Sequence, residues 1–272
     1  REPGFNQKAT ISSEISAAAK AGITALCVPP DTRPVLDTPA VAEAVREKAE
    51  NAGYRNVYPI AALTLGLAGN ELSAMYAMQQ AGCIAVSNAQ RPISNLLILN
   101  RAMEYAATHD LLLIYRPEEH WLRNGGCAHE GIVATRYGLP GIPETAETIA
   151  LAQCLELAAR NGCRVHFSQL SCARSVALLQ EAKAKGLPVT ADVAMHQLHL
   201  TEDDMIPFDS NYHVNPPLRT ERDKLSLRAA VADGSIDAVC SDHQPHDIDA
   251  KLGAFPETEP GIAAMETLLP LM

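Results

Sequence analysis

The sequence predicts an α/β protein, and within that class a (β/α)8 barrel of the TIM type, from three observations. Short apolar runs alternate with helix-length amphipathic segments along the chain. The runs lack the two-residue alternation of a strand with one solvent-facing side, so they predict parallel strands buried on both faces. The length of 272 residues is close to the ~250 residues of one such barrel. We therefore expect a single barrel domain over residues 1–272.

The predicted elements follow one another as helix and then strand. The first helix is expected over 10–21, because a Thr/Ser cluster is typical of a helix start and Gly22 of a helix end. The first strand is expected over 23–28, where two prolines end the apolar run. The other predicted pairs are 39–51 with 57–63, 71–80 with 83–86, 94–109 with 111–115, 144–161 with 163–167, 173–185 with 187–193, and 221–233 with 236–240.

These elements give seven strands, and an eighth strand before Arg1 would close the barrel. A doubly wound open sheet is the competing layout, but no G-x-G-x-x-G opens a helix. Residues 116–143 predict a long functional loop at a strand end. Arg1 is not a natural first residue and 268–272 ends within an apolar, helix-like segment. We therefore expect a barrel truncated at both ends.

Charge and cysteine content limit the function classes. The formal net charge is −10 and no cluster of Lys and Arg occurs, which argues against a nucleic-acid partner. The sequence contains no run of about eighteen apolar residues, which is the length that a membrane-spanning helix needs. The seven cysteines form no C-x-x-C pair and are odd in number, so they indicate neither a disulfide framework nor a structural zinc site. We expect a cytoplasmic protein.

Three segments carry residues that could do chemistry. The last predicted strand is followed by 241–246, Ser-Asp-His-Gln-Pro-His, and upstream lies 215–219, Asn-Pro-Pro-Leu-Arg, while 1–4, Arg-Glu-Pro-Gly, opens the chain. A D-H-x-x-H group at a strand end can ligate a metal or abstract a proton. Taken alone, it is better explained by a capped loop with surface histidines.

Together, these segments resemble the dihydroorotases of the amidohydrolase superfamily, whose pattern includes R-E-P-G, N-P-P-L-R and S-D-H-x-P-H. Further matches are 28–34 to the family's M-P-N-T-x-P, 182–186 followed by 189–193, and 260–267, Pro-Gly-Ile-Ala-Ala-Met-Glu-Thr. The resemblance runs nearly the whole length of the chain. It implies a barrel of the metal-dependent hydrolase type, in which water bridged between two Zn²⁺ ions hydrolyses or closes a cyclic amide.

The metal positions of the resembled family are largely changed. A carboxylate position holds Asn88, a histidine position holds Arg116, and the second histidine of H-x-x-H is Gln169, so only Asp242 is retained. The family's H-x-H pair would precede Arg1. A guanidinium has no lone pair to donate, and at ~4 Å it repels each unit of metal charge by about 4 kcal/mol at an effective dielectric of 20. We expect no bound metal and no catalytic residue, with Asp242 a remnant.

Four further positions match substrate contacts of the family. Arg1, Asn215 and His246 agree with it, whereas Asp31 stands where the family has an Asn and would oppose an anionic substrate. The alternative interpretation is that these polar residues persist because they anchor loops at the barrel mouth.

A positive hypothesis concerns the changed metal positions. Arg116 is expected to fill the vacated space and to pair with Asp242, because a buried carboxylate needs a compensating partner. The histidines at 120, 129, 196 and 199 are interpreted as surface or hydrogen-bonded residues rather than as ligands of a replacement metal. No G-x-S-x-G elbow occurs.

The leading functional hypothesis is a non-catalytic dihydroorotase-like chain. The resemblance implies a structural partner of the aspartate carbamoyltransferase catalytic chain, in a hetero-oligomer of pyrimidine biosynthesis. The alternative is an active zinc dihydroorotase, which would convert carbamoyl aspartate to dihydroorotate with one Zn²⁺ held by the H-x-H pair and Asp242. Allantoinase- or hydantoinase-like chemistry is a third possibility, and it requires the same missing ligands.

Overall fold

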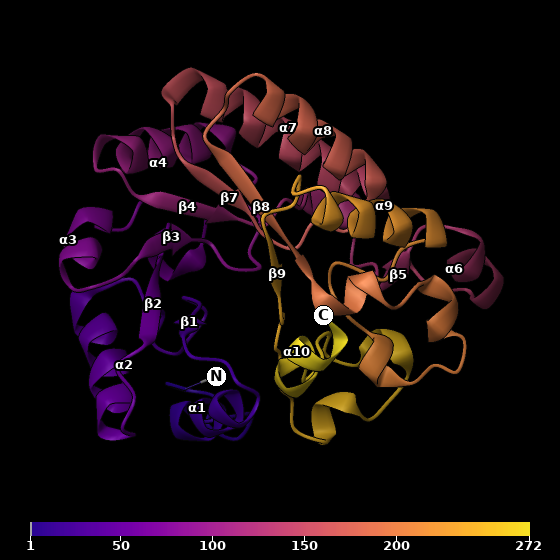
Figure 1. The fold of residues 1–272 in the computed structure, drawn as a ribbon, viewed down its shortest axis with the longest axis horizontal. Helices are drawn as coiled ribbons and strands as arrows, with labels where there is room; N and C mark the ends of the chain where they lie inside the picture. Colours follow the sequence, from indigo (N-terminus) through magenta and orange to yellow (C-terminus); the bar gives the residue numbers. More distant parts are fainter. Residues whose placement is uncertain (1) are drawn as a thin grey trace. The chain divides into compact units, whose positions relative to one another are not determined.

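A computed structural model describes residues 2–272 and divides the chain into two compact units (Figure 1). The first comprises the chain up to Arg116 together with Glu156–His166, and the second comprises Pro117–Leu155 and Phe167–Met272. Arg1, a predicted pocket residue, lies outside the described residues. The expectation of a single barrel domain stays a prediction.

The first unit is built on four parallel strands in the order β1-β2-β3-β4. Leu26 of β1 lies opposite Val57 of β2, and Ala85 of β3 lies opposite Leu112 of β4. The strands span Leu26–Val28, Val57–Ala62, Ala85–Ser87 and Leu112–Tyr115. Each strand lies inside or within one residue of a predicted apolar run, so the buried parallel arrangement expected from the sequence is observed.

The helices of the first unit are α1, α2, α3 and α4, and α2 and α3 lie beside β2 (Figure 1). They span Ile11–Lys20, Pro39–Asn51, Met75–Gln80 and Leu96–Thr108. Thr10 caps α1 by accepting from the Ser13 amide at 3.1 Å. The start predicted for α3 was wrong by four residues, because Glu71 is hydrogen-bonded to Leu65 through the backbone instead.

The second unit contains a parallel pair, β8 and β9, with α8 and α9 packed on each other and α8 on β8 (Figure 1). Thr220 caps α9 in a capping box with Asp223. Helix α7 and strand β7 each pass from one unit to the other. The bounds are Glu144–Asn161 for α7, Val165–Phe167 for β7, Ala173–Ala184 for α8, Val189–Ala194 for β8, Glu221–Ala232 for α9, Ala238–Cys240 for β9 and Leu268–Leu271 for α10.

The segment between β4 and α7, predicted as a loop, has secondary structure of its own. It contains helices α5 and α6 and a two-stranded parallel sheet of β5 and β6. These span His120–Arg123, Ile132–Tyr137, Ala128–His129 and Gly141–Ile142. Several of its side chains are buried with those of the later part of the second unit, namely Cys127, Ala128, Val133 and Ala134 with Met205, Val214, Leu218 and Phe255. Apolar burial therefore anchors this segment.

Among residues 2–272, no helix is both long and apolar enough to cross a membrane.

Candidate functional site

In the second unit, polar side chains follow three strand ends. Gln169 follows β7, His196 lies in the 3-10 turn after β8, and Asp242 follows β9. The Gln169 amide nitrogen donates to Oδ1 of Asp242 at 2.5 Å. Gln244 donates to the same oxygen at 2.7 Å. The retained acidic residue of the predicted metal site is therefore hydrogen-bonded to two amides of its own unit.

His196 lies beside the other oxygen of this carboxylate. Its Nε2 is 4.0 Å from Oδ2 of Asp242, and the two side chains are only 5% and 4% exposed. Within residues 2–272, neither ring nitrogen has a hydrogen-bond partner. Burial lowers the pKa of His196 to about 4, so the ring is neutral near pH 7. The interpretation of His196 as a surface or hydrogen-bonded histidine was therefore wrong.

The backbone at two of these positions is unusual. Gln169 has φ 62° and Asp242 has φ 43°, the left-handed region that non-glycine residues seldom occupy. Asp192 of β8 holds the first of these turns, because its carboxylate accepts from the Gln169 amide at 2.7 Å and from the Ser168 hydroxyl at 3.0 Å. Residues held in sparsely populated conformations cluster at functional sites, and here they occur at the two bonded side chains.

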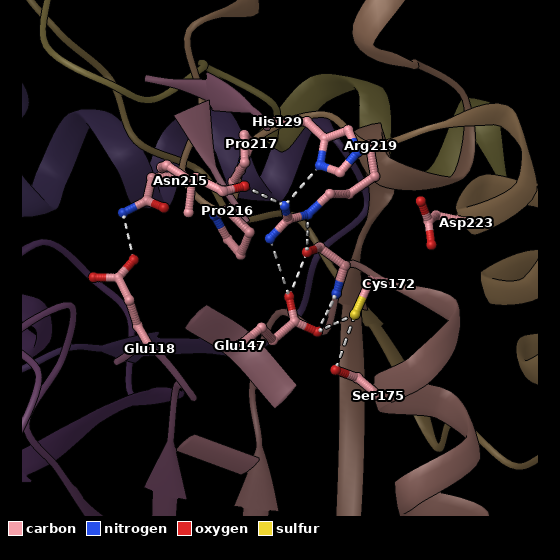
Figure 2. Close-up of polar contacts among 12 residues, drawn as sticks. Glu118, His129, Glu147, Cys172, Ser175, Asn215, Pro216, Pro217, Arg219 and Asp223 are labelled. Carbon is pink, nitrogen blue, oxygen red and sulfur yellow. Dashed lines mark hydrogen bonds and ion pairs between the residues drawn. The ribbon is translucent and has the colours of Figure 1, made fainter. Parts of the chain in front are cut away.

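A second polar cluster is centred on Arg219, the last residue of the Asn-Pro-Pro-Leu-Arg segment (Figure 2). Its guanidinium donates to Oγ of Ser171 at 3.1 Å, to the Ile142 carbonyl at 2.8 Å and to Nδ1 of His129 at 3.0 Å. It also lies 3.9 Å from the Glu147 carboxylate. These contacts fasten the β5–β6 sheet and α7 to the segment that precedes α9.

The Glu147 carboxylate is enclosed by donors. It accepts from the Ser171 amide at 3.0 Å and from the Ser171 hydroxyl, and the Cys172 thiol lies 3.6 Å away (Figure 2). Burial, followed by the Glu147 charge, raises the pKa of the Cys172 thiol. Cys172 is therefore held as a thiol and not as a nucleophilic thiolate.

Two predicted pocket residues bind other protein groups. The Asn215 amide donates to the buried Glu118 carboxylate at 3.1 Å (Figure 2), and Arg123 of α5 lies 3.8 Å from the same carboxylate. The His246 ring donates through Nε2 to the Pro260 carbonyl at 3.0 Å, and its Nδ1 is 3.3 Å from Glu259. Both contacts fit the loop-anchoring interpretation of these residues.

In the first unit, the changed ligand positions are buried. Asn88 is 4% exposed; its carbonyl accepts from Thr64 at 2.7 Å and its amide donates to the Arg91 carbonyl at 2.9 Å. Arg116 is 8% exposed and donates to the Gln90 carbonyl at 3.3 Å.

The predicted pair of Arg116 with Asp242 joins residues of different units and stays a prediction. Asp31, in the stretch that follows β1, is half-buried.

The donor set does not fit the two Zn²⁺ ions that the resemblance implies. Zinc binds thiolate, imidazole and carboxylate ligands, whereas Gln169 turns its amide nitrogen toward Asp242. Within the described part of the chain, no group of three or more His, Cys, Asp or Glu side chains is placed to hold a metal ion. No step can be derived through a metal with these residues.

Sequence reasoning missed Gln244, Glu147 and Glu118. Gln244 occupies the variable position of S-D-H-x-P-H, and only its reach to Asp242 reveals its importance. Glu147 and Glu118 lie among many acidic residues near helix starts, where a carboxylate is ordinarily a capping group. The one signal in the sequence is indirect: the partners of these two carboxylates, Arg219 and Asn215, belong to the Asn-Pro-Pro-Leu-Arg segment.

Comparison with known proteins identifies relatives along the whole chain. A family model described as Dihydro-orotase-like matches residues 1–175. A protein named Dihydroorotase-like protein from Pseudomonas aeruginosa is 52% identical over 271 residues, covering 100% of this chain and 64% of the relative. A protein named Dihydroorotase from Desulfotalea psychrophila is 43% identical over the same shares of both chains. The chain thus spans 64% of the length of these curated relatives.

Solved structures agree in fold. L-hydantoinase from Arthrobacter aurescens aligns with a TM-score of 0.82 at 21% identity, over 97% of this chain and 60% of that one. Dihydroorotase from Saccharomyces cerevisiae, in complex with 5-fluoroorotic acid, aligns with a TM-score of 0.73 at 17% identity, over 94% and 71%. At these identities the likeness concerns the fold alone. It confirms the predicted barrel class.

Proposed function

This chain belongs to the dihydroorotase-like family, and we propose that it is a member without catalytic activity that serves as a structural partner of aspartate carbamoyltransferase. The proposal has two parts, the loss of the metal-dependent reaction and the gain of a role in assembly. They rest on different observations and are tested separately.

The single observation that carries the first part is the hydrogen bond between Gln169 and Asp242. At the position where the resembled family has a histidine ligand, an amide donates to the retained carboxylate at 2.5 Å. An amide hydrogen at this place occupies a lone pair that a metal would need. Loss of even an indirect support for a metal site costs about 10–100-fold in affinity, so the loss of direct ligands supports a protein that holds no zinc.

The first unit supports the same conclusion independently. Arg116 stands at a second histidine position and is buried, and a guanidinium keeps its charge and offers no lone pair. Asn88, at the carboxylate position, has both ends of its amide engaged by Thr64 and Arg91. The changed positions are thus Asn88 and Arg116 in the first unit and Gln169 in the second. No single substitution would restore all three.

Elemental analysis and an activity assay test this part. The full-length protein, of which this chain spans a share, is expected to carry far less than one zinc per chain and to leave carbamoyl aspartate unchanged. The competing function is an active mononuclear dihydroorotase. It is favoured by the retained Asp242 and by the 43% identity to a protein named Dihydroorotase. Stoichiometric zinc together with turnover would establish the competing function and reject ours.

The proposed role in assembly is implied by the resemblance. Because the chain spans 64% of the length of the relative, we assign this role to the full-length protein. The test is co-purification of the tagged full-length chain with the transferase from the same cell. We expect a hetero-oligomer in which the transferase loses activity or stability when the chain is withheld. A transferase that assembles and works equally well alone would contradict this part and would leave the metal question untouched.

A further inference from the structure

We propose that Gln244 acts together with Gln169 to exclude a cation from Oδ1 of Asp242, by placing two amide donors on this oxygen. The inference rests on the proposed loss of the metal and adds a residue that the family pattern leaves variable. In this proposal, Gln244 controls the access of a cation to Oδ1 of Asp242.

Both lone pairs of one Asp242 oxygen are engaged by amides. Oδ1 of Asp242 accepts from Gln169 at 2.5 Å and from Gln244 at 2.7 Å. A carboxylate oxygen offers two lone-pair directions, so two amide hydrogens use both of them. A zinc ion must approach such an oxygen to about 2.0–2.2 Å. A cation can therefore bind Oδ1 only if at least one amide leaves.

Displacing the Gln244 side chain is unfavourable. The residue is 6% exposed, and its backbone amide donates to the Ile262 carbonyl at 2.9 Å. Gly261 approaches its stem so closely that a Cβ at that glycine would lie 2.6 Å from Cβ of Gln244. Backbone and stem are thus both fixed, and a displaced amide would be buried without its acceptor.

Gln169 is held in place independently of Gln244. Its backbone amide donates to Asp192 at 2.7 Å, which holds the left-handed turn at φ 62°. The two glutamines therefore approach Asp242 from separate strand ends, after β7 and after β9. Replacing one of them leaves the other in position.

A histidine lies close to the same carboxylate. His196 presents Nε2 4.0 Å from Oδ2 of Asp242, so a nitrogen ligand already lies beside the carboxylate. A histidine at position 169 would add a second. Two histidines and one aspartate form a set of three ligands of the kind that holds a single zinc or cobalt ion. With a histidine at position 169, the Gln244 amide would still occupy one lone pair of Oδ1 and compete with a cation for this oxygen.

The experiment is a Co²⁺ titration of the intact chain, followed by the visible absorption that appears when cobalt enters a protein site. Four proteins are compared: wild type, Gln169→His, Gln244→Ala and the double variant. We expect one Co²⁺ per chain in the double variant, bound several-fold more tightly than by Gln169→His, because only the double variant frees both lone pairs of Oδ1. Wild type and Gln244→Ala should develop no band.

Two controls keep the comparison interpretable. Gln180→Ala, added to Gln169→His, removes an exposed amide that bonds Ser235 and should leave the cobalt affinity unchanged. Gln244→Met, added to Gln169→His, keeps the volume without the donors and should reproduce the double variant even if the alanine unfolds the loop.

Equal cobalt affinity in Gln169→His and the double variant, or no binding by folded double variants, would overturn the inference. Zinc content of the wild type tests the proposed function separately.

Discussion

The Arg219 guanidinium and the Glu147 carboxylate form an ion pair at 3.9 Å in which the two side chains are only 2% and 4% exposed (Figure 2). The pair lies inside the second unit and joins α7 to the segment that precedes α9. Other donors complete the set around the carboxylate, chiefly Ser171. In a buried pair, removing one charge leaves the other without compensation.

Neutralising Glu147 should therefore destabilise the protein strongly. Glu147→Gln is expected to lower the free energy of unfolding by about 3–5 kcal/mol, because Arg219 stays buried and charged. Urea unfolding, followed by circular dichroism, measures the change. The control is Glu221→Gln, which removes an exposed partner of Lys224 in the same unit and should cost no more than about 1 kcal/mol. Similar losses in both variants would mean that the buried pair contributes no more to stability than the exposed pair of Glu221 with Lys224.

Acid should destabilise the fold through buried histidines. Burial lowers the pKa of His129, His196 and His213 from an ordinary value of 6.5 to about 4. Between these values the unfolded chain takes up protons that the folded chain does not, so these three histidines make stability fall as the pH falls from 6.5 toward 4 and contribute no pH dependence above that window. His196→Gln should remove about one third of this contribution, measured as urea midpoints at several pH values. A wild-type midpoint that does not change across the window would contradict the prediction.

A side chain at Gly261 should disturb the turn beside Gln244. Gly261 has φ 136°, and a Cβ there would lie 2.6 Å from Gln244 and 2.8 Å from Nε2 of His246. Gly261→Ala is expected to lower the melting temperature more than Gly253→Ala, because Gly253 also has a large positive φ, 118°, but a Cβ there would lie 3.8 Å from its nearest neighbour, Oε2 of Glu257. The difference between the two variants isolates the clash from the backbone strain, which alone costs about 1–3 kcal/mol. Equal shifts would show that the close approach is unimportant.

A charge at position 215 should release the segment between β4 and α7. Asn215→Asp would place a second carboxylate about 3 Å from Glu118, where the amide now donates at 3.1 Å, and two buried like charges at this distance repel. We expect faster tryptic cleavage at Arg123 and Arg136, read by mass spectrometry. Asn211→Asp makes the same change at an exposed position and should leave the cleavage rate unaltered. Protection equal to wild type in Asn215→Asp would contradict the anchoring role.

Most of the fold could be predicted from the sequence because its signals are local. The cap at Thr10 and the glycine at position 22 bound α1 to within one residue of the prediction, and apolar runs located every strand of the two units except β5 and β6. The failures have long-range causes. Glu71 looks like the start of a helix but is hydrogen-bonded to Leu65. Likewise, β5 and β6 are too short for any periodicity to indicate them.

The candidate site was predictable in its positions and not in its contacts. Motif spacing placed Gln169 and Asp242 after strands of a barrel, where the ends of parallel strands gather polar residues. That both side chains share a hydrogen bond, and that Gln244 joins them, depends on reach and backbone conformation across the fold. His196 illustrates the same limit, because a lone histidine in sequence gives no sign of whether water reaches it.

The sharing of one Asp242 oxygen by Gln169 and Gln244 has a consequence for substitutions at either position. Removing one glutamine leaves the other in place but deprives a carboxylate that is only 4% exposed of one donor, so each single variant should be less stable than the present protein. Both positions have to change together before this oxygen is free of amide donors.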